Sequence, residues 1–166
     1  MKRVLFFVVT VVLGIVIHVF CEWYLSFFYN VGPQVLLLGV LAIGFLCGPL
    51  TAEALGVVWG LISDAMGVGL FGMTALLLPL AGYIAGKLRR RVASERPAAQ
   101  IAIAFFGTLL YGAGVQVLLE LFDPSVTRSL LPSVLIGGLM NILLVTAVFW
   151  VIERWIDLWL IHPEQV

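Results

Sequence analysis

The sequence predicts an all-α polytopic membrane protein, with six transmembrane helices in a single integral membrane domain at residues 1–166. The first observation is the composition, which is 63% hydrophobic and 11% charged with a mean hydropathy of +1.17. Soluble domains are about 45–50% apolar and about 25% charged. The second is a series of long apolar runs separated by short polar turns. The third is the position of the basic residues, which stay on the cytoplasmic side of membrane spans.

The first predicted span covers residues 4–27, and Trp23 and Tyr24 form an aromatic belt at its outer end. Its basic start and apolar run are also typical of a signal peptide. The bulky Val19-Phe20-Cys21 does not fit a cleavage site, however, so we expect an uncleaved anchor.

Two short apolar helices follow at residues 34–47 and 51–64, separated by Gly48-Pro49. We expect Thr51 to cap the second of them, with Glu53 in its first turn. A helix of this length rises only ~21 Å, short of the ~30 Å hydrocarbon core of a bilayer. A re-entrant hairpin is the alternative, but the charge distribution favours two short true spans that thin the bilayer or are shielded by neighbouring helices.

The fourth span, residues 73–88, contains Pro79, which should kink it, and ends in a basic cluster at residues 87–91. The fifth and sixth spans cover residues 98–121 and 130–152. A Trp-rich tail after them, containing Trp155 and Trp159, is expected to lie along the inner membrane interface. Six spans place both termini in the cytoplasm, together with every basic residue except Arg128.

Asp64 needs an explanation, because ionisable residues at membrane depth are costly and a carboxylate at the end of a helix opposes the helix dipole. One interpretation is structural: the glycines at 67, 69 and 72 have free backbone N–H groups, from which this carboxylate could accept hydrogen bonds. The other is a contact with a ligand, a proton or a partner. A lone aspartate is not catalytic machinery.

Glycines also recur at a spacing of four residues, which suits helices whose backbones approach closely. The pairs are Gly44 with Gly48, Gly56 with Gly60, and Gly82 with Gly86. They either close the bundle internally or dock another membrane protein.

Five other polar residues are candidates for a cavity near the outer leaflet: His18, Glu22, Gln116, Glu120 and Asn141. Such groups also serve as hydrogen-bonding links between helices, which is the alternative interpretation. We expect no metal site, because His18 and Glu22 lack a third ligand, and no cofactor. No catalytic motif is recognisable, and zero net charge without a polybasic surface argues against nucleic acid as a partner.

The middle of the chain resembles the central signature of the MreD family of rod shape-determining proteins. The residues that carry this resemblance are Gly-Leu-Ile-Ser-Asp at 60–64, then Gly67, Leu70, Gly72, Gly82-Tyr83 and the basic cluster. Chain length, six spans, a short third helix ending in aspartate and minimal loops are also similar to that family. The resemblance implies a non-enzymatic subunit of the bacterial elongation complex in the inner membrane, which supports peptidoglycan synthesis and rod cell shape.

The resemblance also implies partners and a fold. The direct partner would be MreC, through which the chain would reach the RodA glycosyltransferase and its class B penicillin-binding protein within the lipid bilayer. The fold would be similar to the substrate-binding subunits of energy-coupling-factor transporters. Gly60, Asp64, Gly67 and Gly72 would shape the central turn.

Three functional hypotheses follow. The leading one is a scaffold that binds the membrane helix of MreC against small-residue faces such as that of Gly56 and Gly60. The alternative is the substrate-binding membrane subunit of an energy-coupling-factor vitamin transporter, which needs a pocket lined by Glu22, Gln116, Glu120 and Asn141. A proton-coupled enzyme or channel rests on Asp64 alone.

Overall fold

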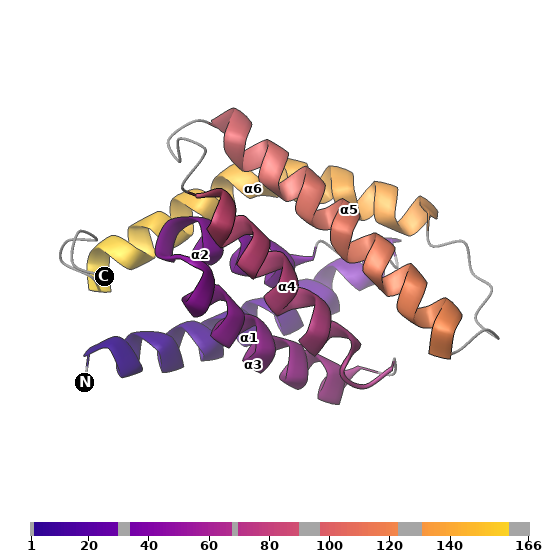
Figure 1. Cartoon of the computed structure of the whole chain (residues 1–166), viewed down its shortest axis with the longest axis horizontal. Coiled ribbons are helices and arrows are strands. Elements are labelled where there is room, and N and C mark those ends of the chain that lie inside the picture. Colours follow the sequence, from indigo (N-terminus) through magenta and orange to yellow (C-terminus); the bar gives the residue numbers. More distant parts are fainter. Residues whose placement is uncertain (1, 30–33, 68–69, 90–96, 123–130, 160–166) are drawn as a thin grey trace.

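The computed structural model describes residues 2–29, 34–67, 70–89, 97–122 and 131–159. These residues form six helices and confirm the expected helix order (Figure 1). The helices are α1 (Lys2–Tyr29), α2 (Val35–Cys47), α3 (Pro49–Met66), α4 (Met73–Leu88), α5 (Pro97–Phe122) and α6 (Leu131–Trp159).

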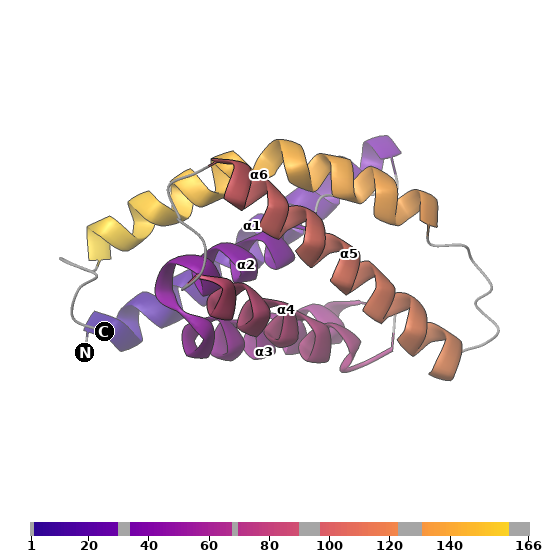
Figure 2. The ribbon, with the colours of Figure 1, turned by 45° about the horizontal axis from the view of Figure 1, so that its top comes forward.

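Successive helices run in opposite directions along the long axis of the molecule (Figures 1 and 2). The start of α1, the end of α4, the start of α5 and the end of α6 therefore lie at one end. The basic residues of the described segments lie toward this same end, because Lys2 and Arg3 begin α1, Lys87 lies in the last turn of α4, Arg89 directly follows α4, and Arg154 lies five residues before the end of α6. We call it the basic end.

Helix α2 is the core of the bundle. Every residue from Leu36 to Phe45 is buried, as expected for a helix that is apolar on all sides. It packs against α4, α3 and α6 and also contacts α1 and α5. Its 13 residues rise only ~20 Å. The surrounding helices shield it from the outside, which agrees with the prediction that neighbouring helices shield a span this short.

The prediction that Thr51 caps α3 is wrong. Helix α3 begins at Pro49, and its N-cap is Gly48, which has a φ of 106° and makes no side-chain capping bond. Proline suits the first helical position because it has no N–H to leave unpaired, and glycine accepts the positive φ. The single residue Gly48 thus joins α2 to α3, and Glu53 falls outside the first turn of α3.

Trp59 of α3 holds α1 against the core. Its indole Nε1 donates a hydrogen bond of 3.0 Å to the backbone oxygen of Val11. Gly14 makes room for the ring, because a Cβ at this position would lie 2.3 Å from Trp59 Cζ2. The fit explains why a glycine stands in the middle of the apolar stretch of this helix, residues 5–21.

The Trp-rich tail continues α6, which reaches Trp159 and contacts α1, and its place at the membrane interface stays a prediction. Trp155 Nε1 donates to Thr10 Oγ1 at 3.0 Å. The rings of Trp159 and Phe6 meet edge to face, with centroids 6.5 Å apart. These contacts join the first and last helices of the chain at the basic end.

By length and composition, two helical stretches of the described residues could cross a membrane, at 98–122 and 137–159. Only 28% and 22% of their most apolar windows are buried in the protein, so large apolar side chains such as Phe106 and Leu143 face outward. Apolar stretches at 5–21, 35–47 and 73–88 are shorter. Six transmembrane spans therefore stay a prediction.

Candidate functional site: the Asp64 turn and the glycine seam

The Asp64 carboxylate caps the amino terminus of α4 from the end of α3. Its Oδ2 accepts hydrogen bonds from the backbone N–H groups of Gly72 and Ala75, both at 3.0 Å, and its Oδ1 accepts one from Thr74 at 3.1 Å. The first N–H groups of a helix have no partner within the helix, and a carboxylate there meets the positive end of the dipole. Asp64 thus supplies the cap that Gly72, the N-cap residue, has no side chain to provide.

The structural interpretation of Asp64 is confirmed for Gly72, but two of its three donors were not foreseen. Gly67 does not donate to it; its N–H bonds the backbone oxygen of Ser63 at 2.9 Å and closes α3. Gly69 lies outside the described residues. Gly72 has a φ of 93°, a conformation that favours glycine and turns the chain into α4 beside the carboxylate.

Five glycines form what we call the glycine seam, where α2, α3 and α4 approach most closely: Gly44, Gly56, Gly60, Gly82 and Gly86. A Cβ at Gly60 would lie 2.3 Å from Ala75 Cα, and one at Gly56 would lie 2.7 Å from Pro79 N. A Cβ at Gly44 would lie 2.5 Å from the backbone oxygen of Gly82. In each case the obstacle is backbone, which cannot move aside as a side chain can.

The glycine seam contradicts the prediction that Gly56 and Gly60 dock a partner helix. Both residues are buried and face α4 of the same chain, so they do not offer a surface to the membrane helix of another protein. Of the two interpretations of the glycine pairs, internal closure of the bundle is the one that the structure supports.

Asn141 links three helices. It is fully buried, and its Nδ2 donates to Thr108 Oγ1 of α5 at 3.0 Å. Its Oδ1 accepts from the backbone N–H of Gln34, the N-cap of α2, at 3.0 Å. The interpretation as a hydrogen-bonding link between helices is confirmed for this residue.

The other cavity candidates make contacts elsewhere. His18 Nε2 lies 3.5 Å from Ser63 Oγ and links α1 to α3. Gln116 donates to Glu120 within α5 at 2.8 Å, on an exposed face, and the side chain of Glu22 lies outside the described residues. The described contacts therefore do not bring these residues together into one polar pocket.

We expect the Asn141–Thr108 bond to stabilise the bundle measurably. In a double-mutant cycle with Asn141→Ala and Thr108→Val, the coupling free energy of unfolding should be about 0.6 kcal/mol, the average for hydrogen bonds between membrane helices, and at most about 1.7 kcal/mol. Unfolding of the purified chain in mixed micelles, followed by circular dichroism, measures it. A coupling of zero would show that Asn141 acts through packing alone.

Together these features define a class: a small helical bundle of the membrane-associated type, whose outer faces are apolar and whose buried polar groups hold its own helices in place. A family model described as rod shape-determining protein MreD matches residues 1–154, and the chain belongs to the MreD family. The family consists of shape-determining structural proteins, which are generally not enzymes. Comparison with curated proteins and with solved structures finds no match, so the similarity to energy-coupling-factor subunits stays a prediction.

Proposed function

We propose that the chain is a multi-pass inner-membrane subunit of the bacterial elongation complex that binds MreC and thereby supports peptidoglycan synthesis. Membership of a family with a role in rod shape determination is the observation that carries the proposal. RodA and its class B penicillin-binding protein would be reached through MreC. The chain would contribute a binding surface rather than a reaction.

The use of the polar residues supports a scaffold. Asp64 caps α4, Asn141 links α5, α6 and α2, and Trp59 holds α1. These groups stabilise one arrangement of helices and are not directed at a substrate. The transporter alternative gains no support from the described residues, since Asn141 is buried and bonds Gln34 and Thr108, whereas Gln116 and Glu120 bond each other on an exposed face of α5.

The glycine seam is internal, so the surface for MreC must be sought on outward-facing helices. Helices α1, α5 and α6 each expose large apolar side chains, among them Val16, Phe106 and Leu143. A single membrane helix would pack on such a face through van der Waals contacts, the main attraction between helices in lipid.

The alternating helix directions and the common basic end support the proposed topology of six spans with cytoplasmic termini. We predict that a cysteine at Ser94 reacts only from the cytoplasm and one at Ser125 only from the periplasm. The test uses Ser94→Cys and Ser125→Cys in a chain with Cys21→Ala and Cys47→Ala, treated in intact cells with an impermeant maleimide. Labelling of the Ser94→Cys chain before lysis would contradict the topology.

A further inference from the structure

The two sides of the bundle have apolar faces of different length. Figures 1 and 2 show α6 on one side of α2 and α3 on the opposite side. On the α6 side, no charged residue occurs between Leu131 and Ile152 of α6 or between Ala98 and Leu119 of α5. Each of these stretches rises ~32 Å at 1.5 Å per residue. Their length matches the ~30 Å hydrocarbon core of a bilayer.

The α3–α4 side is shorter. Helix α3 exposes one apolar stripe, whose residues are three or four positions apart: Leu50, Ala54, Val57, Leu61 and Ala65. The stripe rises only ~22 Å from its first residue to its last. In α4 the rise from the N-cap Gly72 to Lys87 is also ~22 Å. This side is therefore ~8 Å shorter than the hydrocarbon core.

The charged groups at the ends of the short side are held in place. The Asp64 carboxylate accepts three backbone N–H groups at the start of α4, so it cannot extend toward a more distant interface. Lys87 Nζ lies 4.8 Å from the centre of the Tyr83 ring, one turn back along α4, so its charge is turned toward the middle of the helix. Tilting would not help, because a tilted helix spans less of the bilayer.

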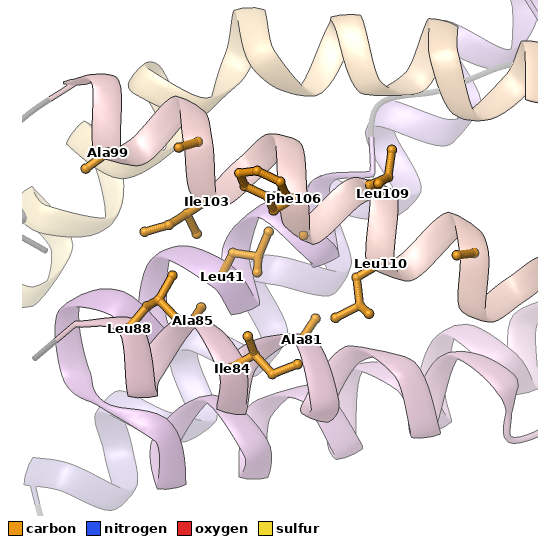
Figure 3. Close-up of a pocket in the computed structure, with 13 residues that line it drawn as sticks. Leu41, Ala81, Ile84, Ala85, Leu88, Ala99, Ile103, Phe106, Leu109 and Leu110 are labelled. Atoms are coloured by element: carbon orange, nitrogen blue, oxygen red, sulfur yellow. The ribbon is translucent and has the colours of Figure 1, made fainter. Parts of the chain in front are cut away.

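Neighbouring helices shield α2 but not the outer faces of α3 and α4. Val57 and Leu61 of α3 and Leu80 of α4 are exposed. Figure 3 shows that α5 does not close over α4 either, because an apolar groove separates Ile84 of α4 from Phe106 of α5. Shielding within the chain therefore does not compensate for the short length of this side, and the surrounding bilayer has to adapt.

We propose that the α3–α4 side thins the bilayer and is covered by phospholipids with short acyl chains, whereas the bilayer keeps its ordinary thickness beside α6. The inference rests on the proposed membrane topology. A span that is too short for the hydrocarbon core is accommodated by thinning, at a cost that grows with each ångström of mismatch. Lipids with shorter chains reduce this cost at the α3–α4 side, while they gain nothing beside the longer α6.

The test compares lipid contact at two exposed sites on each side, in the purified full chain with Cys21→Ala and Cys47→Ala. Single cysteines that carry a fluorophore replace Val57 or Leu61 on α3 and Leu139 or Leu143 on α6, all exposed in the structure. The bilayers contain brominated dioleoyl phosphatidylcholine, which quenches the fluorophore, mixed with a plain phosphatidylcholine. The plain lipid is either dioleoyl, which gives the baseline at each site, or the shorter dimyristoleoyl form.

We expect the short lipid to be enriched about twofold at both α3 sites, as a modest cost of mismatch would produce, and not at the α6 sites. Equal contact with the short lipid at all four sites would overturn the inference. It would leave the proposed function standing, because MreC is absent from the measurement. A lack of quenching at all four sites would instead contradict the membrane topology itself.

Discussion

Replacing Gly60 with alanine is expected to lower the free energy of unfolding by about 3 kcal/mol, the upper part of the range for overpacked cores. The added Cβ would lie 2.3 Å from Ala75 Cα and 2.6 Å from Ala75 N. Because these are backbone atoms of α4, the α3–α4 pair must separate to admit a single methyl group. Unfolding of the purified chain in mixed micelles measures the loss.

The matched control is Gly138→Ala in α6. A Cβ there would lie 3.7 Å from Thr108 Cγ2, an ordinary van der Waals contact. Alanine is the better helix former by about 1 kcal/mol, so this variant should be as stable as the wild type or more so. If the two variants were equally stable, the backbones of α3 and α4 would not be in close contact at Gly60 and Ala75.

Replacing Asp64 with alanine is the second large expected effect. Three backbone N–H groups at the start of α4 would lose their acceptor. Loss of an N-cap costs up to about 2 kcal/mol, and charged acceptors bind about twice as strongly as neutral ones, so we expect a loss of about 2–3 kcal/mol. Asp64→Asn keeps one acceptor oxygen and should lose about half as much.

Hydrogen exchange distinguishes this role from a functional contact. The amides of Gly72, Thr74 and Ala75 should exchange faster in the Asp64→Ala chain, while those within α6 stay protected. Glu120→Gln is the control, because its bond to Gln116 lies on an exposed face of α5. Unchanged stability and exchange in the Asp64→Ala chain would return Asp64 to the list of ligand, proton or partner contacts.

The extent of the helices could be predicted from the sequence, because apolar runs and Gly-Pro turns are local signals. The predicted N-cap of α3 lies three residues too late, since Thr51 offers a capping side chain while the actual N-cap, Gly48, acts through its φ of 106°. The sequence does not predict that the Trp-rich segment after residue 152 continues α6 and contacts α1, because nothing local shows that Trp155 bonds Thr10, 145 residues away.

The sequence identifies residues of the candidate site but not the helix terminus that Asp64 caps. The sequence predicts that Asp64 caps its own turn, whereas in the structure the acceptor lies near the end of α3 and its donors lie at the start of α4. The six-residue connection from Gly67 to Gly72 is the signal that could have shown this, because so short a link forces the end of α3 beside the start of α4. Small residues, in turn, indicate a close approach of helices without identifying the neighbouring helix. The sequence therefore leaves a partner as one possible neighbour of Gly56 and Gly60, whereas in the structure both face α4.

The central claim is that the chain is a membrane scaffold for MreC, and a detergent pull-down of the tagged full chain from its native membranes, read by mass spectrometry, tests it most directly. We predict recovery of MreC, a single-span protein with a periplasmic part, together with wall synthases at lower yield. An outward-facing substitution such as Leu143→Ala should leave the fold intact and can then map the surface. Recovery of a pair of ATPases with a transmembrane coupling subunit, and no MreC, would contradict the account in favour of a vitamin transporter.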